Sequence, residues 1–311
     1  MATKTPIDFS IGYQNIDGLH TKSFSCKLPY IQKKFIHDFE ILTETWGSCE
    51  HNKEIDGYQL LEIEPQKEKG ISKGRASGGL LIYCKSYLFK YIKECNRTPY
   101  YIWLEINKNI FHSLQENIKV CIAYNPPINS NYCNKTLYDE ISTELLARHS
   151  LDTPFLLIGD LNSRTGELTE VCDTDNNIDE SDEPPSRAVT PARRENCDKT
   201  VNQMGNKLID MCKAHDLQIL NGRTLGDRTG SFTFFDQSQG ASAIDIAIAS
   251  DSLQPMIKSL VVQHQTEVSK HCKIVVRIKN LKESVTEEEK SKDNYPWIPT
   301  GKKIHMARSF C

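Results

Sequence analysis

Short apolar segments that fit β-strands recur along most of this chain of 311 residues, and only three segments show helical spacing. Many strands with few helices between them favour two packed β-sheets covered by helices over a doubly wound parallel sheet. The predicted strands are 7–15, 39–46, 58–64, 78–84, 101–107, 118–124, 155–160, 217–221, 231–235, 242–250 and 273–279. The predicted helices are 28–39, 135–148 with Asn134 as N-cap, and 205–215.

Composition narrows the class of protein. Apolar residues make up 38% of the chain, which is enough for a sizeable core. No apolar run approaches the ~18 residues of a membrane helix, and the first residues form no secretory signal, so we expect an intracellular protein. The formal charge of −3 argues against a protein that coats nucleic acid, but it allows an enzyme with a local basic surface.

Two stretches depart from the strand-rich pattern. Residues 166–185 contain eight acidic residues and no basic one, which is typical of a long solvated loop. The segment 282–311 is polar, rich in Lys and Glu, and interrupted by proline. We therefore expect one domain over 1–281, followed by a polar tail or linker over 282–311.

Polar residues stand at or near the ends of several apolar strands. They are Asn15, Glu44, Tyr124, Asp160, Asn162, Asp245 and His271. Strands bring their ends to one edge of a sheet, so these side chains can converge. Carboxylates, amides and one histidine, without cysteine, suit Mg²⁺ or Mn²⁺ better than zinc. Such a site can hydrolyse a phosphate ester, although most of these residues, taken singly, have an ordinary structural explanation.

Asp245 is the exception among them. It stands inside the apolar run SAIDIAIA, where a charged group must be either paired or functional.

Eight short motifs in order resemble one known superfamily. They are Asn15, TETW, GRASGGL, AYNPP, GDLNSRTG, SFTF, SAID and SKHCKI. Together they resemble the endonuclease/exonuclease/phosphatase superfamily, and within it most closely the apurinic-like endonuclease domain of non-LTR (LINE-type) retrotransposons. The resemblance covers roughly residues 7–280. It implies a four-layer α/β sandwich, with two mainly antiparallel sheets flanked by helices.

The resemblance also implies a role for each matching residue. Glu44 would be the principal Mg²⁺ ligand, with Asn15 beside it. Asp160 would orient or deprotonate the attacking water, and Asn162 would hold both Asp160 and the scissile phosphate.

The remaining matches concern the phosphate. Tyr124 would donate to a phosphate oxygen, and Asp245 would pair with His271 and favour its charged form. Two basic residues, Arg75 and Arg164, are further candidate phosphate contacts.

One position departs from the superfamily. The last motif is normally Ser-Asp-His, and here it is Ser269-Lys270-His271. Because the missing carboxylate lies near the metal, the departure implies a weakened metal site.

The leading functional hypothesis is a metal-dependent DNA endonuclease that nicks one strand and leaves a 3′-hydroxyl. In retrotransposons that end primes reverse transcription, so the resemblance implies a reverse-transcriptase region in a longer parent polyprotein and a nuclear location. A second hypothesis is a phosphatase or phosphodiesterase acting on a small-molecule or lipid phosphate. A third is a catalytically weakened domain kept as an interaction module, which the lysine at position 270 and the acidic loop favour.

Overall fold

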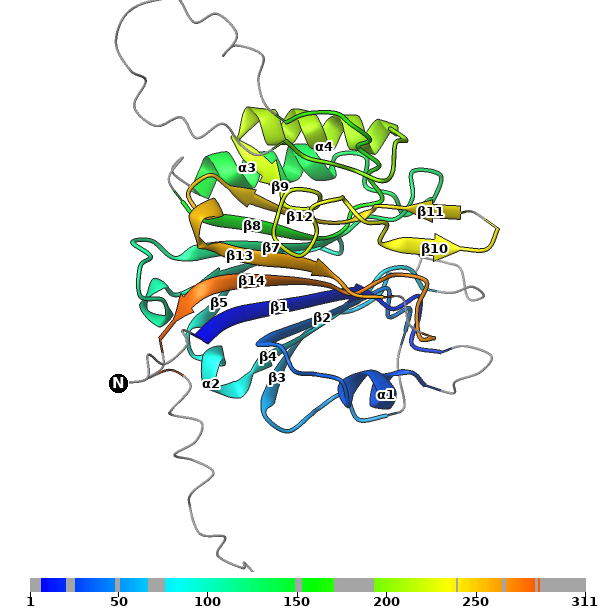
Figure 1. Cartoon of the computed structure of the whole chain (residues 1–311). Coiled ribbons are helices and arrows are strands. Elements are labelled where there is room, and N and C mark those ends of the chain that lie inside the picture. The colour runs from blue at the N-terminus through cyan, green and yellow to red at the C-terminus, as the bar shows by residue number, and fades with distance from the viewer. Residues whose placement is uncertain are drawn as a thin grey trace, which may run out of the picture.

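Two six-stranded β-sheets lie face to face in the computed structural model of this chain (Figure 1). The first sheet contains, in spatial order, β13 (Ile257–Val262), β14 (Ile274–Leu281), β1 (Ile7–Asn15), β2 (Phe39–Thr43), β4 (Leu80–Lys85) and β3 (Tyr58–Ile63). The second contains β5 (Ile92–Arg97), β6 (Tyr101–Ile106), β7 (Ile118–Tyr124), β8 (Phe155–Asp160), β12 (Asp245–Ser250) and β9 (Leu217–Ile219). The residues described are 7–20, 26–47, 51–66, 76–148, 153–170, 193–238, 240–264, 267–282 and 285.

The remaining elements lie around these sheets. A two-stranded hairpin is formed by β10 (Phe234–Asp236) and β11 (Gly240–Ser242). The helices are α1 (Leu28–Gln32), α2 (Ser86–Phe89), α3 (Leu137–Arg148) and α4 (Gln203–Ala214), with short 3₁₀ turns at Lys108–Ile110 and Gln254–Met256.

The core between the sheets follows from the alternation of side chains along each strand. Phe9, Ile11 and Tyr13 of β1 point to one face and are fully buried against the second sheet. The outer face of the second sheet is covered by α3 and α4, and the outer face of the first by α1 (Figure 1). This helix–sheet–sheet–helix order confirms the expected four-layer α/β sandwich.

The register of the strands explains why polar residues gather at one edge. Each sheet contains one parallel pair, β1 with β2 and β7 with β8, and its other pairs are antiparallel. Asn15 lies opposite Thr43, and Tyr124 lies opposite Asp160. Parallel strands end at the same edge of a sheet, so their last residues become neighbours.

The first helix is shorter than predicted. α1 ends at Gln32, Ile36 is 69% exposed, and Phe39 already belongs to β2. The carboxylate of Glu40 accepts hydrogen bonds from the backbone N–H groups of Ile36 and His37, at 2.9 and 3.1 Å. These contacts turn the chain into β2. The helix predicted over 28–39 is therefore wrong beyond Gln32.

The predicted tail lies almost entirely outside the described residues. The exceptions are Lys282, whose N–H donates to the carbonyl of Ile110 at 2.8 Å, and Val285, which is 4% exposed and packs in the core. The packed part of the chain therefore extends at least to Val285, and the domain boundary stays a prediction. Most of the acidic stretch, 171–185, is likewise not described. No helix in the described ranges is long and apolar enough to cross a bilayer.

Candidate active site

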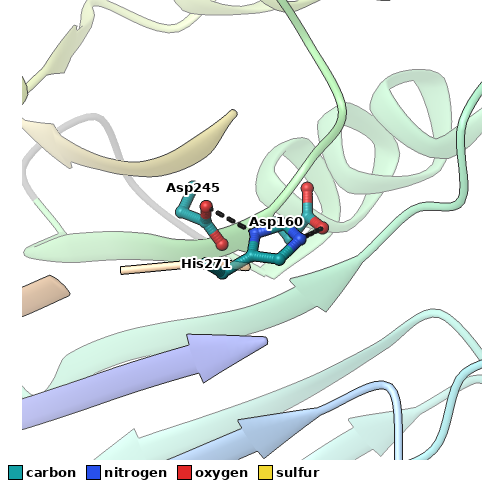
Figure 2. Close-up of side chains that lie close together, drawn as sticks. All are labelled: Asp160, Asp245 and His271. Carbon is teal, nitrogen blue, oxygen red and sulfur yellow. Dashed lines mark hydrogen bonds and ion pairs between the residues drawn. The ribbon is translucent and has the colours of Figure 1, made fainter. Parts of the chain in front are cut away.

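The end of β8, the start of β12 and the residues just before β14 bring three titratable side chains together (Figure 2). The Nδ1 atom of His271 lies 2.8 Å from Oδ2 of Asp245, and its Nε2 atom lies 3.9 Å from Oδ2 of Asp160. All three side chains are nearly or fully buried. The imidazole ring thus stands between two carboxylates that belong to neighbouring strands of the second sheet.

The buried charges of this cluster shift the acidity of its members. Burial by itself lowers the pKa of His271, but the carboxylates of Asp245 and Asp160 outweigh burial and raise that pKa to about 9. Burial, together with the nearby carboxylate of Asp245, raises the pKa of Asp160 well above its usual range. At neutral pH the imidazole is therefore held as a cation, and the Asp160 carboxyl binds its proton more tightly than an ordinary aspartate.

Hydrogen bonds fix the orientation of the Asp160 carboxylate. The amide of Asn15 donates to its Oδ2 at 2.8 Å, and the backbone N–H of Asn162 donates to its Oδ1 at 3.1 Å. The side-chain amide of Asn162 donates to the carbonyl of Asn125 at 2.9 Å. The backbone of Asn162 has a φ of +47°, a conformation that asparagine tolerates better than most residues. Asn15 and Asn162 therefore hold Asp160 from two sides.

Glu44 and Tyr124 form a second contact at this edge. The hydroxyl of Tyr124 donates to Oε1 of Glu44. Burial and the Glu44 carboxylate raise the pKa of Tyr124, so the phenol keeps its proton. Glu44 has a φ of +56°, which costs a residue with a side chain about 1–2 kcal/mol. Such strain is found where the surrounding structure over-determines a conformation, as it does at functional sites.

The donor atoms of the cluster fit a hard divalent cation. Asp160, Asp245 and His271 each offer one ligand atom, and these atoms lie within 4.8 Å of one another. Oδ1 of Asp245 is buried without a hydrogen-bond partner among the described residues. A cation near Asp160, Asp245 and the half-buried Glu44 would favour the ionised form of the Asp160 carboxyl. His271 binds Asp245 through Nδ1 and is protonated, so oxygen atoms are the better ligands.

Of the basic residues singled out in the sequence, the two that the structure describes form ion pairs with carboxylates outside this cluster. The guanidinium of Arg164 binds both carboxylate oxygens of Asp198, through Nε at 2.8 Å and Nη2 at 2.6 Å. Lys270 forms an ion pair with Asp236 at the end of β10. Arg75 lies outside the described residues. A phosphate contact by Arg164 or Arg75 stays a prediction.

Three hydroxyl side chains for which the sequence predicted no role support the cluster. The hydroxyl of Tyr13 accepts from the backbone N–H of Asp160 at 2.6 Å. The hydroxyl of Thr233 accepts from the backbone N–H of Asp245 at 2.9 Å. The hydroxyl of Ser269 donates to the carbonyl of Asn15 at 2.6 Å and accepts from the N–H of His271 at 3.0 Å. Thr233 and Ser269 belong to the motifs SFTF and SKHCKI, and Tyr13 lies in a predicted strand, but no pattern marked their hydroxyls as functional.

A buried lysine supports the backbone just after β1, next to Asn15. Lys27 is 1% exposed, and its ammonium donates to the carbonyls of Ile16 and Asp17 at 2.6 and 3.1 Å. Asp17 has a φ of +48°, and its N–H donates to Oδ1 of Asn15 at 2.9 Å. Lys27 thus stabilises the turn that follows β1. The Asp-Gly pair after the strand was the signal in the sequence for this turn.

Comparison with known proteins gives a fold but no close relative. No protein-family model and no curated protein matches the sequence. Among solved structures, AP endonuclease LMAP from Leishmania major has a TM-score of 0.61 at 12% identity, over 88% of each chain. The endonuclease domain of TRAS1, a telomere-specific non-LTR retrotransposon, has a TM-score of 0.54 at 13% identity, over 89% of this chain and 100% of that one.

A third similar structure is the 3′-5′ exonuclease NExo from Neisseria meningitidis. Its TM-score is 0.51 at 14% identity, over 87% of this chain and 99% of that one. At these identities the likeness concerns the fold. This chain has the α/β-sandwich fold of these nucleases, which confirms the fold that the resemblance to the endonuclease/exonuclease/phosphatase superfamily implied.

Proposed function

We propose that this protein is a divalent-metal-dependent phosphodiesterase that acts on DNA and nicks one strand. The observation that carries the proposal is the cluster of Asp160, Asp245 and His271, in which a charged imidazole faces a carboxylate that two asparagines orient. The similar solved structures support a nucleic-acid substrate, since one is described as a 3′ phosphatase bound to a product DNA hairpin.

Each residue has a task that its contacts suit. Asp160 would orient the attacking water and accept its proton, because Asn15 and Asn162 fix both carboxylate oxygens. His271, held by Asp245 in its charged form, would stabilise the negative charge that develops on the phosphate. Tyr124 would donate to a phosphate oxygen.

Glu44 and Asn15 would hold a magnesium or manganese ion. When bound, the ion would supply positive charge against the phosphate oxygens. The Glu44 carboxylate adds to the raised pKa of Asp160, so it lies within electrostatic range of the cluster, which supports this assignment.

Nicking of supercoiled plasmid in Mg²⁺, Mn²⁺ or EDTA tests the proposal. We expect nicking with either ion, none in EDTA, and none with Asp160→Asn. Asp210→Asn is the matched control, since Asp210 is exposed on α4. Phosphate release from small phosphate esters without nicking would favour the small-molecule hypothesis. DNA binding without hydrolysis would favour the interaction module.

The chemistry of the nicked end tests the narrower part of the proposal. A nick with a 3′-hydroxyl can prime a reverse transcriptase, and we include such a partner region and a nuclear location in the proposal. Extension of the nicked strand by a polymerase, without prior phosphatase treatment, is the expected result. Failure of that extension would contradict the retrotransposon-type role and leave the phosphodiesterase itself in place.

A further inference from the structure

Residues 16–19, which form the turn after β1, are bonded to the backbone that carries Glu44. The N–H of Gly18 donates to the carbonyl of Glu44 itself at 2.8 Å, and the N–H of Leu19 donates to the carbonyl of Thr45 at 3.3 Å. Glu44 is one of the two proposed metal ligands. The position of its backbone therefore depends on this turn.

The same turn orients the other proposed metal ligand, Asn15. The N–H of Asp17 donates to Oδ1 of Asn15 at 2.9 Å, and the amide nitrogen of Asn15 donates to Asp160 at 2.8 Å. Asp17 itself has a left-handed backbone, with a φ of +48°. A residue with a side chain adopts that conformation at a cost, so the surrounding structure must hold it in place.

Lys27 supplies much of that hold. It is 1% exposed, and its ammonium donates to the carbonyls of Ile16 and Asp17 at 2.6 and 3.1 Å. Its backbone N–H donates to the carbonyl of Leu19 at 2.7 Å. Lys27 directly precedes α1, so three contacts from one residue join the start of this helix to the turn (Figure 1). Burial of an ammonium is costly, which makes the bonds that it forms here specific to this arrangement.

The turn is also packed against an aromatic ring. A Cβ atom on Gly18 would lie 2.2 Å from Cε3 of Trp46, so only glycine leaves room for the indole. Trp46 follows Glu44 by two positions, and its N–H donates to the carbonyl of Gly78 at 3.1 Å. The turn is therefore held both by the buried ammonium and by the indole beside Glu44.

A buried ammonium near a metal site has two opposite effects. Burial lowers the pKa of Lys27, and the carboxylates of Asp17 and Glu44 oppose that shift, so the ammonium lies within electrostatic range of Glu44. Its charge by itself would repel a metal ion. Its bonds to the turn would instead keep the ligands in place. Both hydrogen bonds that the ammonium forms among the described residues go to the turn, which favours the second effect.

We propose that Lys27 is a positioning residue for the metal site, and that by holding the turn 16–19 it keeps Asn15 and Glu44 in the geometry that binds the ion. The inference rests on the proposed function, because it takes these two residues as the metal ligands. Lys27 acts through the turn and does not itself touch the ion.

Mn²⁺ binding tests this inference without any nicking reaction. Free Mn²⁺ is followed by electron paramagnetic resonance as the ion is titrated into the full chain at pH 7, and Glu44→Gln identifies the binding that belongs to this site. Lys27→Met keeps an unbranched stem and removes the ammonium. It should weaken Mn²⁺ binding about tenfold, as changes just behind metal ligands do. Lys33→Met removes the same charge from an exposed position after α1 and should leave the affinity within about twofold.

Two glycines supply a second matched pair, which leaves the ammonium in place. Gly18 and Gly57 have φ angles of +81° and +80°, so alanine introduces the same backbone strain at either position. At Gly18 the added Cβ also meets Trp46, whereas at Gly57 nothing lies within 4 Å of it. Gly18→Ala should therefore weaken Mn²⁺ binding about tenfold, and Gly57→Ala should leave it within about twofold.

The possible results lead to different conclusions. An unchanged affinity in Lys27→Met with a lower Tm would show a purely structural role, and a tighter affinity would show that the charge only repels the ion; either result overturns the inference. If Lys27→Met does not fold, equal affinities of Gly18→Ala and Gly57→Ala overturn it. Failure of the parent chain to bind Mn²⁺ would refute the proposed metal site and this inference with it. Binding by the parent chain, with the same affinity in the variants, would refute this inference alone.

Discussion

The ammonium nitrogen of Lys270 lies 2.7 Å from Oδ2 of Asp236, so the residue just before His271 is tied to the hairpin β10–β11. The Lys270 side chain is 51% exposed. The hydrogen bond to Asp236 raises its pKa, and the carboxylates of Asp17 and Glu44 add to the shift. Lys270, which replaces an expected carboxylate, therefore lies within electrostatic range of Glu44. Its ion pair with Asp236 holds the ammonium away from Glu44.

Loss of the ion pair between Lys270 and Asp236 should weaken metal binding. We expect Asp236→Asn to raise the Mg²⁺ concentration for half-maximal nicking about fivefold, which corresponds to about 1 kcal/mol of repulsion between partly exposed charges. Lys270→Asp should lower that concentration, and the double variant should behave like Lys270→Asp. Metal titration of plasmid nicking measures all three.

Ser238→Ala is the control for the hairpin itself. Oδ1 of Asp236 accepts hydrogen bonds from both the backbone N–H of Ser238, at 2.8 Å, and the Ser238 hydroxyl. The alanine variant removes the hydroxyl and loosens this turn without freeing Lys270. Its metal dependence should be unchanged. A shift as large as that of Asp236→Asn would show that hairpin order, and not the charge of Lys270, controls the metal site.

The pairing of Asp245 with His271 predicts strongly non-additive effects. Asp245→Asn and His271→Gln should each lower the nicking rate by about 10²–10⁴, the usual range for an acid–base or charge-stabilising group. The double variant should be little slower than either single one, because each change removes the same charged imidazole. If the nicking rate of the double variant falls by the product of the two single losses, the two residues act separately.

Strand ends were the part of the site that the sequence could predict. Asn15, Tyr124 and Asp160 each end an apolar strand, and Glu44 comes directly after one. The parallel pairs β1–β2 and β7–β8 then bring these ends together. The prediction that these side chains converge uses only the alternation of side chains along a strand and the general geometry of a sheet.

What the sequence did not predict depends on distant partners. The strands β5 and β13 were missed because each carries polar residues at exposed or partly exposed positions, which weakens the apolar pattern of a strand. The pairing of Arg164 with Asp198 joins two loops 34 positions apart. The burial of Lys27 depends on carbonyls that only the folded turn presents. No local pattern contains these contacts.

The raised pKa values predict that stability falls as pH rises in the absence of metal. Between the usual pKa of an aspartate and the raised pKa of Asp160, the folded state binds a proton that the unfolded state has lost. His271 acts in the same direction between about 6.5 and 9. Stability from both groups is therefore greatest at low pH within this window and is lost as pH rises through the folded pKa values.

Asp160→Asn should remove the aspartate part of this loss. In EDTA at pH 7–8 we expect its Tm to lie about 3–6 °C above that of the parent chain, because one pKa unit is about 1.4 kcal/mol and a domain of this size gains about 2–4 °C per kcal/mol. The difference should shrink at pH 4–5, because this range is close to the usual pKa of an aspartate and the unfolded parent chain then also binds part of a proton. Thermal melts across this pH range provide the check. A Tm difference that grows toward acid pH would contradict the assigned direction.

The last prediction concerns where the folded domain ends. Val285 is 4% exposed in the core, and the N–H of Lys282 donates to the carbonyl of Ile110. A chain that ends at Leu281 loses both contacts, whereas a chain that ends at Val285 keeps them. Burial of a valine is worth about 1.5–3 kcal/mol, so at about 2–4 °C per kcal/mol the shorter chain should melt about 3–12 °C below the longer one. The longer one should match the full chain, because 286–311 has no periodic apolar face. Val285→Ala in the full chain should give part of the same loss, and equal melting of both truncations would show that Val285 contributes nothing to the core.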